Sequence, residues 1–152
     1  MSFVPGLRSN YAQVGPLVYF GRCLDKIRLR AADKLPAEYH DNLGAGFDAR
    51  LCTFLGVSYA DLKTHTLTGA TDADILAWAR AHGTPRSDED CAMWSRFMTK
   101  IGWRDERSAA LKQRIAVLGL EAKPIETFFD LNEFDEGRDP VAGRFWENPP
   151  SA

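Results

Sequence analysis

The sequence lacks paired cysteines and long apolar runs, and each absence narrows the class of protein. Its three cysteines, Cys23, Cys52 and Cys91, are odd in number and include no Cys-x-x-Cys pair. This usage predicts reduced, buried thiols in a reducing compartment rather than a disulfide framework. No stretch approaches the roughly 20 apolar residues that a membrane-spanning helix needs, and no secretory signal pattern opens the chain. We therefore expect a cytoplasmic protein with no membrane partner.

A strong excess of one charge is also lacking. The formal net charge is −2 over 152 residues, with 45% hydrophobic and 26% charged residues, as in ordinary globular domains. This balance supplies no field that would draw the chain to nucleic acid or to an anionic membrane. Locally, residues 96–114 carry six basic and two acidic side chains, and residues 121–139 carry seven acidic and two basic ones. We expect the acidic segment to fold back over the basic one, with a partner-binding patch as the alternative.

Strand patterns are nearly absent, and apolar residues instead recur at helical spacing between glycine and proline breaks. Helices are predicted over residues 17–34, 47–55, 58–67, 72–82, 88–101, 104–118 and 124–134. The chain is therefore predicted to be all-α, a compact single-domain bundle of six or seven short helices. The helical domain is expected to cover residues 17–138, between an extended N-terminal segment, residues 1–16, and a C-terminal tail, residues 139–152, that docks through Phe145 and Trp146.

Three stretches are distinctive in combination: GRCLDKIRLRAADKLPAEYH, GFDARLCTFLGV and TFFDLNEFDEGR. Together they resemble a bacterial family known only as domain of unknown function 5069, and the likeness covers residues 17–138. The resemblance implies a small soluble helical domain of bacterial origin. It implies no activity, ligand or catalytic residue, so the functional expectations rest on the residues themselves.

The first predicted helix has two faces that both suggest burial. One apolar stripe consists of Leu17, Phe20, Leu24, Ile27 and Ala31. Almost opposite, Val18 and Leu29 bracket the charged residues Arg22 and Asp25. A helix that only covers a core should be polar on its back, so this pattern indicates packing on both sides. Because buried charges must be paired, Arg22 and Asp25 are predicted either to stabilise the structure as a pair or to line a polar pocket.

The loop that follows this helix is rich in groups that a ligand site would use. It holds a hydroxyl donor, a group that titrates near neutral pH, and an acid–base pair, on Tyr39, His40, Asp48 and Arg50. Two glycines in the same loop permit close backbone approach ahead of a helix N-terminus. The candidate ligand-binding residues are therefore Arg22, Asp25, Tyr39, His40, Asp48 and Arg50. A tight interhelical loop without a ligand is the alternative.

No pattern indicates a metal, a cofactor or a catalytic residue. The three histidines share no ligand spacing with one another or with a cysteine. The acidic stretch 130–137 fails as a calcium loop, because Phe134 occupies a ligand position and Asp135 stands where the turn needs glycine. We expect this stretch to be the frayed acidic end of the last helix.

These observations favour a non-catalytic binding or regulatory module for a partner protein or a small polar ligand. The alternative is a small-molecule enzyme with a polar site between the first helix and residues 39–50, in which Asp25 or His40 would act as a general base. A third hypothesis is a nucleic-acid binder through the basic residues 96–114. The acidic balance of the chain and the lack of a basic arm count against nucleic acid.

Overall fold

The computed structural model describes residues 2–149 and 151. These residues form eight α-helices and one small sheet. The helices are α1 (Phe20–Ala31), α2 (Gly46–Leu55), α3 (Tyr59–Thr66), α4 (Asp72–His82), α5 (Asp88–Met98), α6 (Ser108–Val117), α7 (Phe128–Asp135) and α8 (Pro140–Gly143). A 3₁₀ helix, η1 (Ala37–Asn42), follows α1, and the strands β1 (Gln13–Val14) and β2 (Leu17–Val18) pair antiparallel. The predicted helical fold class is confirmed. Residues 1, 150 and 152 of the predicted terminal segments lie outside the described part.

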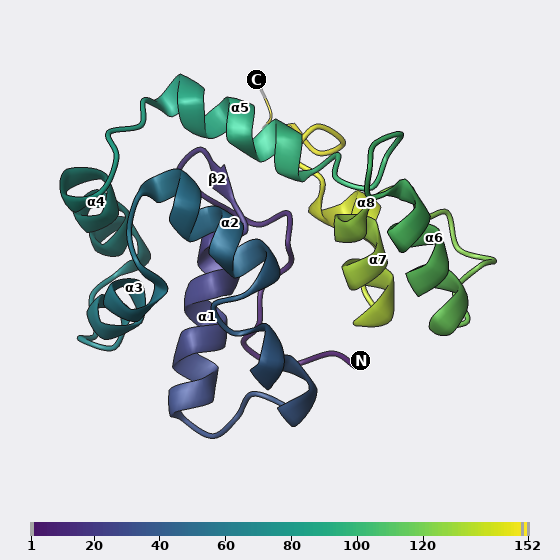
Figure 1. Ribbon diagram of the computed structural model, residues 1–152, viewed down its shortest axis with the longest axis horizontal. Coiled ribbons are helices and arrows are strands. Elements are labelled where there is room, and N and C mark those ends of the chain that lie inside the picture. The colour runs from purple at the N-terminus through teal and green to yellow at the C-terminus, as the bar shows by residue number, and fades with distance from the viewer. Residues whose placement is uncertain (1, 150, 152) are drawn as a thin grey trace.

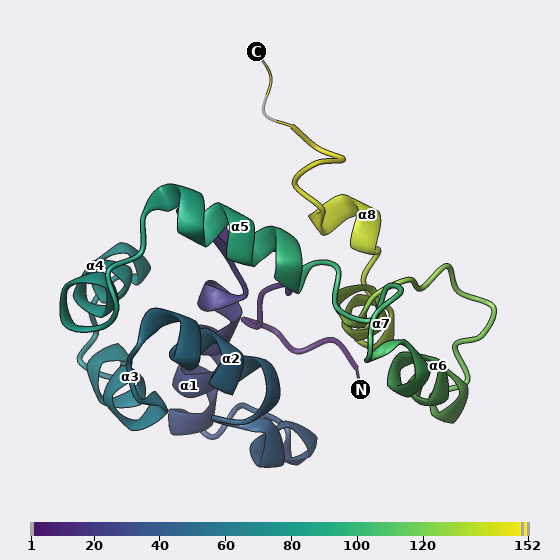
Figure 2. The same cartoon turned by 45° about the horizontal axis from the view of Figure 1, so that its top comes forward.

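Helix α5 joins two groups of helices (Figure 1). On one side, α1 lies among α2, α3 and α4, and on the other side α6 and α7 stand together (Figures 1 and 2). The core gathers around α1, and its fully buried side chains include Phe20, Leu24, Leu51, Leu62 and Ile75. Cys23, Cys52 and Cys91 are free and buried, as predicted. None of the helices in the described residues is long and apolar enough to cross a membrane.

The N-terminal segment packs between the two groups of helices and bonds to both. The Nε of Arg8 donates to Oδ2 of Asp25 on α1 at 2.8 Å. The backbone and side-chain N–H groups of Asn10 donate to Oε1 of Glu133 on α7, each at 3.0 Å. Asn10 and Glu133 are both buried, where a bond to a charged acceptor contributes about 1.5–3 kcal/mol. The segment is therefore part of the contact that holds α1 near α7.

Helix α1 is shorter than predicted at both ends. It begins at Phe20 rather than Leu17, because Tyr19 has a left-handed backbone (φ 67°) and its N–H donates to the carbonyl of Asn10 at 3.1 Å. It ends at Ala31, before Asp33, which also has a positive φ of 55°, whereas the predicted helix extended to residue 34. The prediction that both faces pack is confirmed, since Arg22 is 4% exposed and Asp25 is 7% exposed.

Side-chain hydroxyl groups cap the N-termini of three helices. The hydroxyl groups of Ser58, Thr71 and Ser87 accept hydrogen bonds from the backbone N–H three residues later. Ser87 also forms a full capping box with Asp90. In the helix that follows Ser87, Phe97 is 54% exposed, although it lies at helical spacing with the apolar residues Trp94, Met98 and Ile101.

Helices α6 and α7 each begin four residues later than predicted. Gly102 (φ 99°) and Arg104 (φ 50°) turn the chain in the left-handed region, so α6 starts at Ser108. The stretch after Pro124 stays non-helical until the hydroxyl of Thr127 accepts from the N–H of Asp130 and caps α7. The N-cap Thr127 lies three residues inside the predicted helix, so α7 begins later than predicted.

The acidic end of α7 is not frayed, contrary to our expectation. Asp130, Glu133 and Glu136 are each 1% exposed. Asp130 pairs with Arg144 and Glu136 with Arg22, so these two acids neutralise partners outside the basic stretch 96–114. The burial of these three carboxylates is tolerated because each has a charged or hydrogen-bonding partner.

The C-terminal tail docks onto the body, as predicted. The ring of Trp146 meets that of Tyr11 edge to face, with centroids 5.7 Å apart, and Phe145 packs against the main core. The Nζ of Lys100 lies 4.1 Å from the centroid of the Trp146 ring, which adds a cation–π contact.

Candidate functional site

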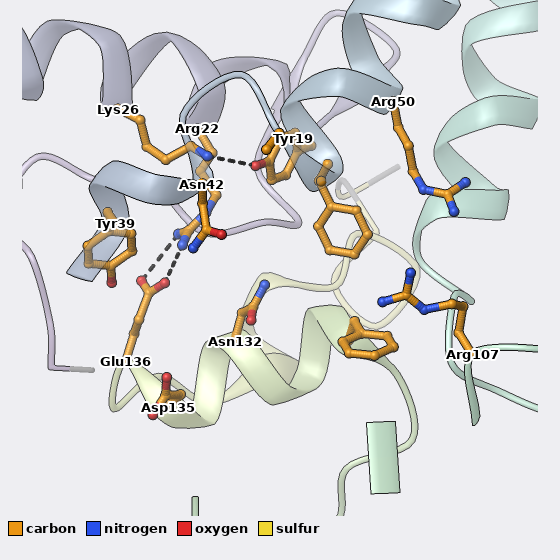
Figure 3. A pocket seen from close by; sticks show the side chains of 14 residues that line it. Tyr19, Arg22, Lys26, Tyr39, Asn42, Arg50, Arg107, Asn132, Asp135 and Glu136 are labelled. Carbon is orange, nitrogen blue, oxygen red and sulfur yellow. Dashed lines mark hydrogen bonds and ion pairs between the residues drawn. The ribbon is translucent and has the colours of Figure 1, made fainter. Parts of the chain in front are cut away.

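A cavity of about 230 Å³ lies between α1, the η1–α2 segment and α7. Its walls come from the beginning of α1, from residues 39–50 and from α7, and Arg107 reaches it from just before α6. Figure 3 shows these side chains converging from elements that are far apart in sequence. The cavity thus occupies the place between the first helix and residues 39–50 where the sequence analysis put a polar site.

One wall of the cavity rests on a buried group of three polar side chains. The Nζ of Lys26 lies 2.6 Å from Oδ1 of Asp48 and donates to the hydroxyl of Tyr19 at 2.9 Å. That hydroxyl donates in turn to Oδ1 of Asp48 at 2.7 Å. Lys26 and Tyr19 line the cavity, and Asp48 lies behind them, fully buried. Burial, helped by the charge of Asp48, raises the pKa of Tyr19 well above its ordinary value, so the phenol stays protonated.

Tyr19 is held in a strained conformation at this position. Its φ of 67° and ψ of −26° lie in the left-handed region, which costs a non-glycine residue of order 1–3 kcal/mol. Its ring packs edge to face on Phe47, with centroids 5.7 Å apart, and near-parallel to Phe129 at 6.1 Å. These contacts and the hydroxyl bonds hold the residue in place, and strain of this kind clusters at functional sites.

A second buried ion pair lines the cavity at the end of α7. Both terminal nitrogens of Arg22 donate to the carboxylate of Glu136, and Nη1 also donates to the carbonyl of Arg8 at 2.9 Å. Arg138 pairs with the same carboxylate from outside. Glu136 therefore has two arginine partners, and the side chain of Asp135 lines the cavity beside it (Figure 3).

The cavity opens between two arginines, Arg50 on α2 and Arg107 at the N-cap of α6. Both residues are exposed, and both side chains point toward the same end of the cavity (Figure 3). The guanidinium of Arg107 lies over the ring of Phe128, with 5.1 Å from Cζ to the centroid. Neither guanidinium has an acidic partner within residues 2–149. Two guanidiniums that form no ion pair within residues 2–149 therefore face one opening.

The other polar groups around the cavity have few hydrogen-bond partners among the described residues. The hydroxyl of Tyr39 is buried with no hydrogen-bond partner among the described residues, and the residue is 3% exposed. Burial and the neighbouring charge of Glu136 raise the pKa of Tyr39 to about 12, so it remains a donor at neutral pH. Asn132 donates to the side-chain oxygen of Asn10 at 3.3 Å, and Asn42 projects into the same space (Figure 3).

Three of the six residues predicted for the site line this cavity, and the other three do not. Arg22, Tyr39 and Arg50 line it, whereas Asp48 lies behind Lys26 and Tyr19. Asp25 accepts three hydrogen bonds from Arg8, outside the cavity. The Nε2 of His40 lies 2.9 Å from the carbonyl of Leu35 and also does not line the cavity.

The predicted pairing of Arg22 with Asp25 is wrong. Both residues are buried on α1, but each meets a partner from a different segment. Arg22 reaches Glu136 at the end of α7, and Asp25 is bound by Arg8 in the N-terminal segment. Sequence spacing on one helix could not reveal these partners.

The sequence analysis missed much of the cavity lining. The missed charged and aromatic residues are Tyr19, Lys26, Phe47, Arg107, Phe128, Asp135 and Glu136. One signal was present for Lys26, which follows Arg22 by four residues and so lies on the same helix face. Arg107 was assigned to a basic surface, because nothing local indicates that it faces a cavity.

No metal site accompanies the cavity in the part of the chain that the structure describes. Within it, no group of three or more His, Cys, Asp or Glu side chains is placed to hold a metal ion. The arrangement instead offers guanidinium, ammonium and amide donors beside aromatic walls. That chemistry suits recognition of an anion.

The fold and the site together define a small helical domain that has a polar cavity between its two groups of helices. The chain belongs to the family described as Domain of unknown function (DUF5069), which matches residues 4–138. All cavity-lining residues, from Tyr19 to Glu136, fall within that match. No curated protein matches the chain.

Proposed function

We propose that this protein is a non-catalytic binding module for a small anionic ligand, which the cavity holds through Arg50 and Arg107. The observation that carries the proposal is the convergence of two guanidiniums without acidic partners on one opening. Like charges brought together repel, and an anion between them removes that penalty. Guanidinium groups also bind carboxylates and phosphates through paired N–H donors.

The size of the cavity supports a small molecule as the ligand. A volume of about 230 Å³ is below the roughly 300–1,000 Å³ of pockets that bury drug-sized ligands, which favours a ligand smaller than a nucleotide. A partner protein could contact only the opening and the exposed arginines there.

The paired state of the interior charges supports binding rather than catalysis. Lys26 is already bound by Asp48 and Tyr19, and Arg22 by Glu136. A general base must be free to accept a proton from a substrate. Asp25 and His40, the bases that the sequence suggested, do not line the cavity.

An enzyme that uses this cavity is the second candidate function, and the strain at Tyr19 favours it. A left-handed tyrosine whose hydroxyl meets Lys26 in a cavity is an arrangement that catalysis could use. Turnover of a bound ligand by the wild-type protein, lost in Tyr19→Phe, would establish this candidate over the first.

The nucleic-acid hypothesis gains no support from the geometry. The basic stretch 96–114 is divided between α5, the connection after it and α6. Its residue Arg107 faces the cavity. We propose instead a cytoplasmic ligand-binding protein of bacterial origin. The three free buried thiols support the cytoplasmic location, because they suit a reducing compartment.

Isothermal titration with acetate and inorganic phosphate tests the proposed function. We expect wild-type protein to bind at least one of these anions, and Arg50→Gln and Arg107→Gln to weaken it about tenfold each. Arg30→Gln is the matched control, because Arg30 is exposed at the end of α1 and does not line the cavity. Equal binding by all four proteins would contradict the proposal.

A further inference from the structure

We infer that the ligand is a monocyclic aromatic acid, whose carboxylate meets the two arginines and whose ring meets Phe47 and Phe128. This inference rests on the proposed function and names the class of ligand for the same cavity. It follows from how the aromatic and cationic residues are paired around the opening. A bare anion would use the arginines but not the exposed parts of the half-buried rings of Phe47 and Phe128.

Each arginine at the opening has a phenylalanine beside it. On α2, Phe47 and Arg50 are three residues apart and so lie on one face of the helix. Across the opening, the guanidinium of Arg107 lies over the ring of Phe128 at 5.1 Å. Charge and ring are therefore neighbours on both sides. A carboxylate attached directly to a ring satisfies both kinds of residue at once.

The aromatic wall is part of a cluster that an additional ring would extend. The rings of Phe47 and Phe128 meet edge to face with centroids 6.4 Å apart. Phe47 meets Tyr19 and Phe129 in the same manner at 5.7 Å and 5.6 Å. Edge-to-face packing is the arrangement that aromatic rings prefer. Phe47 and Phe128 remain half-buried and line the cavity, so both can accept one more ring.

The volume of the cavity sets the size of that ring system. A volume of about 230 Å³, below the roughly 300–1,000 Å³ of pockets that bury drug-sized ligands, favours a single ring such as that of benzoate over a fused two-ring acid. The side of the cavity away from the two arginines, where Tyr39 and Asn42 lie (Figure 3), is polar, so a long apolar chain on the ring would meet polar groups there.

The test compares four probes that separate charge from ring. Wild-type protein is titrated at fixed ionic strength with sodium benzoate, cyclohexanecarboxylate, acetate and inorganic phosphate, followed by calorimetry or by NMR. Benzoate and cyclohexanecarboxylate carry the same charge on rings of the same size, so their difference isolates aromaticity. We expect benzoate to bind about fivefold tighter than cyclohexanecarboxylate and more than tenfold tighter than acetate or phosphate.

Two variants locate the effect. Phe128→Leu should remove most of the preference for benzoate over cyclohexanecarboxylate and leave acetate binding unchanged. Phe134→Leu is the matched control, since Phe134 is on the same helix and does not line the cavity. Arg50→Gln should weaken all three carboxylates together.

The outcomes separate this inference from the proposed function. If the carboxylates bind equally at a site that depends on Arg50, or if phosphate binds tightest, the aromatic acid is overturned and the anion site stands. If none of the four probes binds, or if Arg50→Gln changes nothing, the proposed function fails and the inference with it.

Discussion

The hydroxyl of Tyr19 donates a 2.7 Å hydrogen bond to Oδ1 of Asp48 from a backbone held in the left-handed region. This one contact connects the beginning of α1 to α2 across the back of the cavity. Lys26 bonds to both partners. The buried group therefore fixes the wall of the cavity, and its energetics can be measured residue by residue.

Tyr19→Phe should lower the free energy of unfolding by about 1–3 kcal/mol, because Asp48 and Lys26 each lose a buried hydrogen-bond partner. Urea unfolding followed by circular dichroism measures the change. Tyr59→Phe serves as the control, since the structure gives the half-buried Tyr59 hydroxyl no hydrogen bond among residues 2–149. A loss in Tyr19→Phe no larger than in this control would show that the hydroxyl contributes nothing to stability.

Lys26→Met should destabilise the protein by about 3–5 kcal/mol, because it leaves the carboxylate of Asp48 buried without its cation. The double variant Lys26→Met/Asp48→Leu should lose less than the sum of the two single variants, since it removes both charges. A double-mutant cycle from denaturant unfolding measures this coupling. Strict additivity would contradict a direct interaction between the two residues.

Asp72 should contribute stability that depends on pH. Partial burial raises its pKa, but hydrogen bonds from Arg8 and Arg28 outweigh this and hold the pKa below its ordinary value. A depressed pKa means that the stabilisation is present above about pH 4 and is lost as the pH falls through the folded-state value. Wild type should therefore be more stable than Asp72→Asn at pH 7, with the gap closing toward pH 3. A gap that stayed constant with pH would rule out this linkage.

Arg144→Gln should destabilise the C-terminal docking. Arg144 pairs with Asp130 at 2.7 Å, and that carboxylate is 1% exposed. The loss of a charged partner from a buried carboxylate should lower the free energy of unfolding by more than 1 kcal/mol. The readout is denaturant unfolding, with Lys112→Gln, a change at an exposed residue of α6, as the control. An effect equal to that of the control would indicate that the tail docks through its aromatic residues alone.

The local features of this fold could be predicted from sequence because short-range chemistry determines them. The capping box at Ser87 needs only Asp90, three residues later. The burial of Arg22 and Asp25 follows from the apolar residues that bracket them at helical spacing. Such features depend on neighbours within one or two turns.

The cavity could be predicted only in part because its walls depend on distant contacts. Residues 39–50 and the first helix were identified, but Glu136 and Arg107 join them from more than 80 positions beyond Arg22. The strained Tyr19 was also missed. Its left-handed backbone is imposed by tertiary bonds to Asn10 and Asp48, and tyrosine has no intrinsic preference for that conformation.

Chemical-shift mapping during a titration with benzoate tests the central claim most directly. The account predicts saturable shifts of the backbone amides of residues 45–47 and of the side-chain Nε–H signals of Arg50 and Arg107, all at one affinity. Small shifts that rise linearly without saturation, or shifts confined to Lys112 and Arg114 on α6, would contradict a ligand site in this cavity.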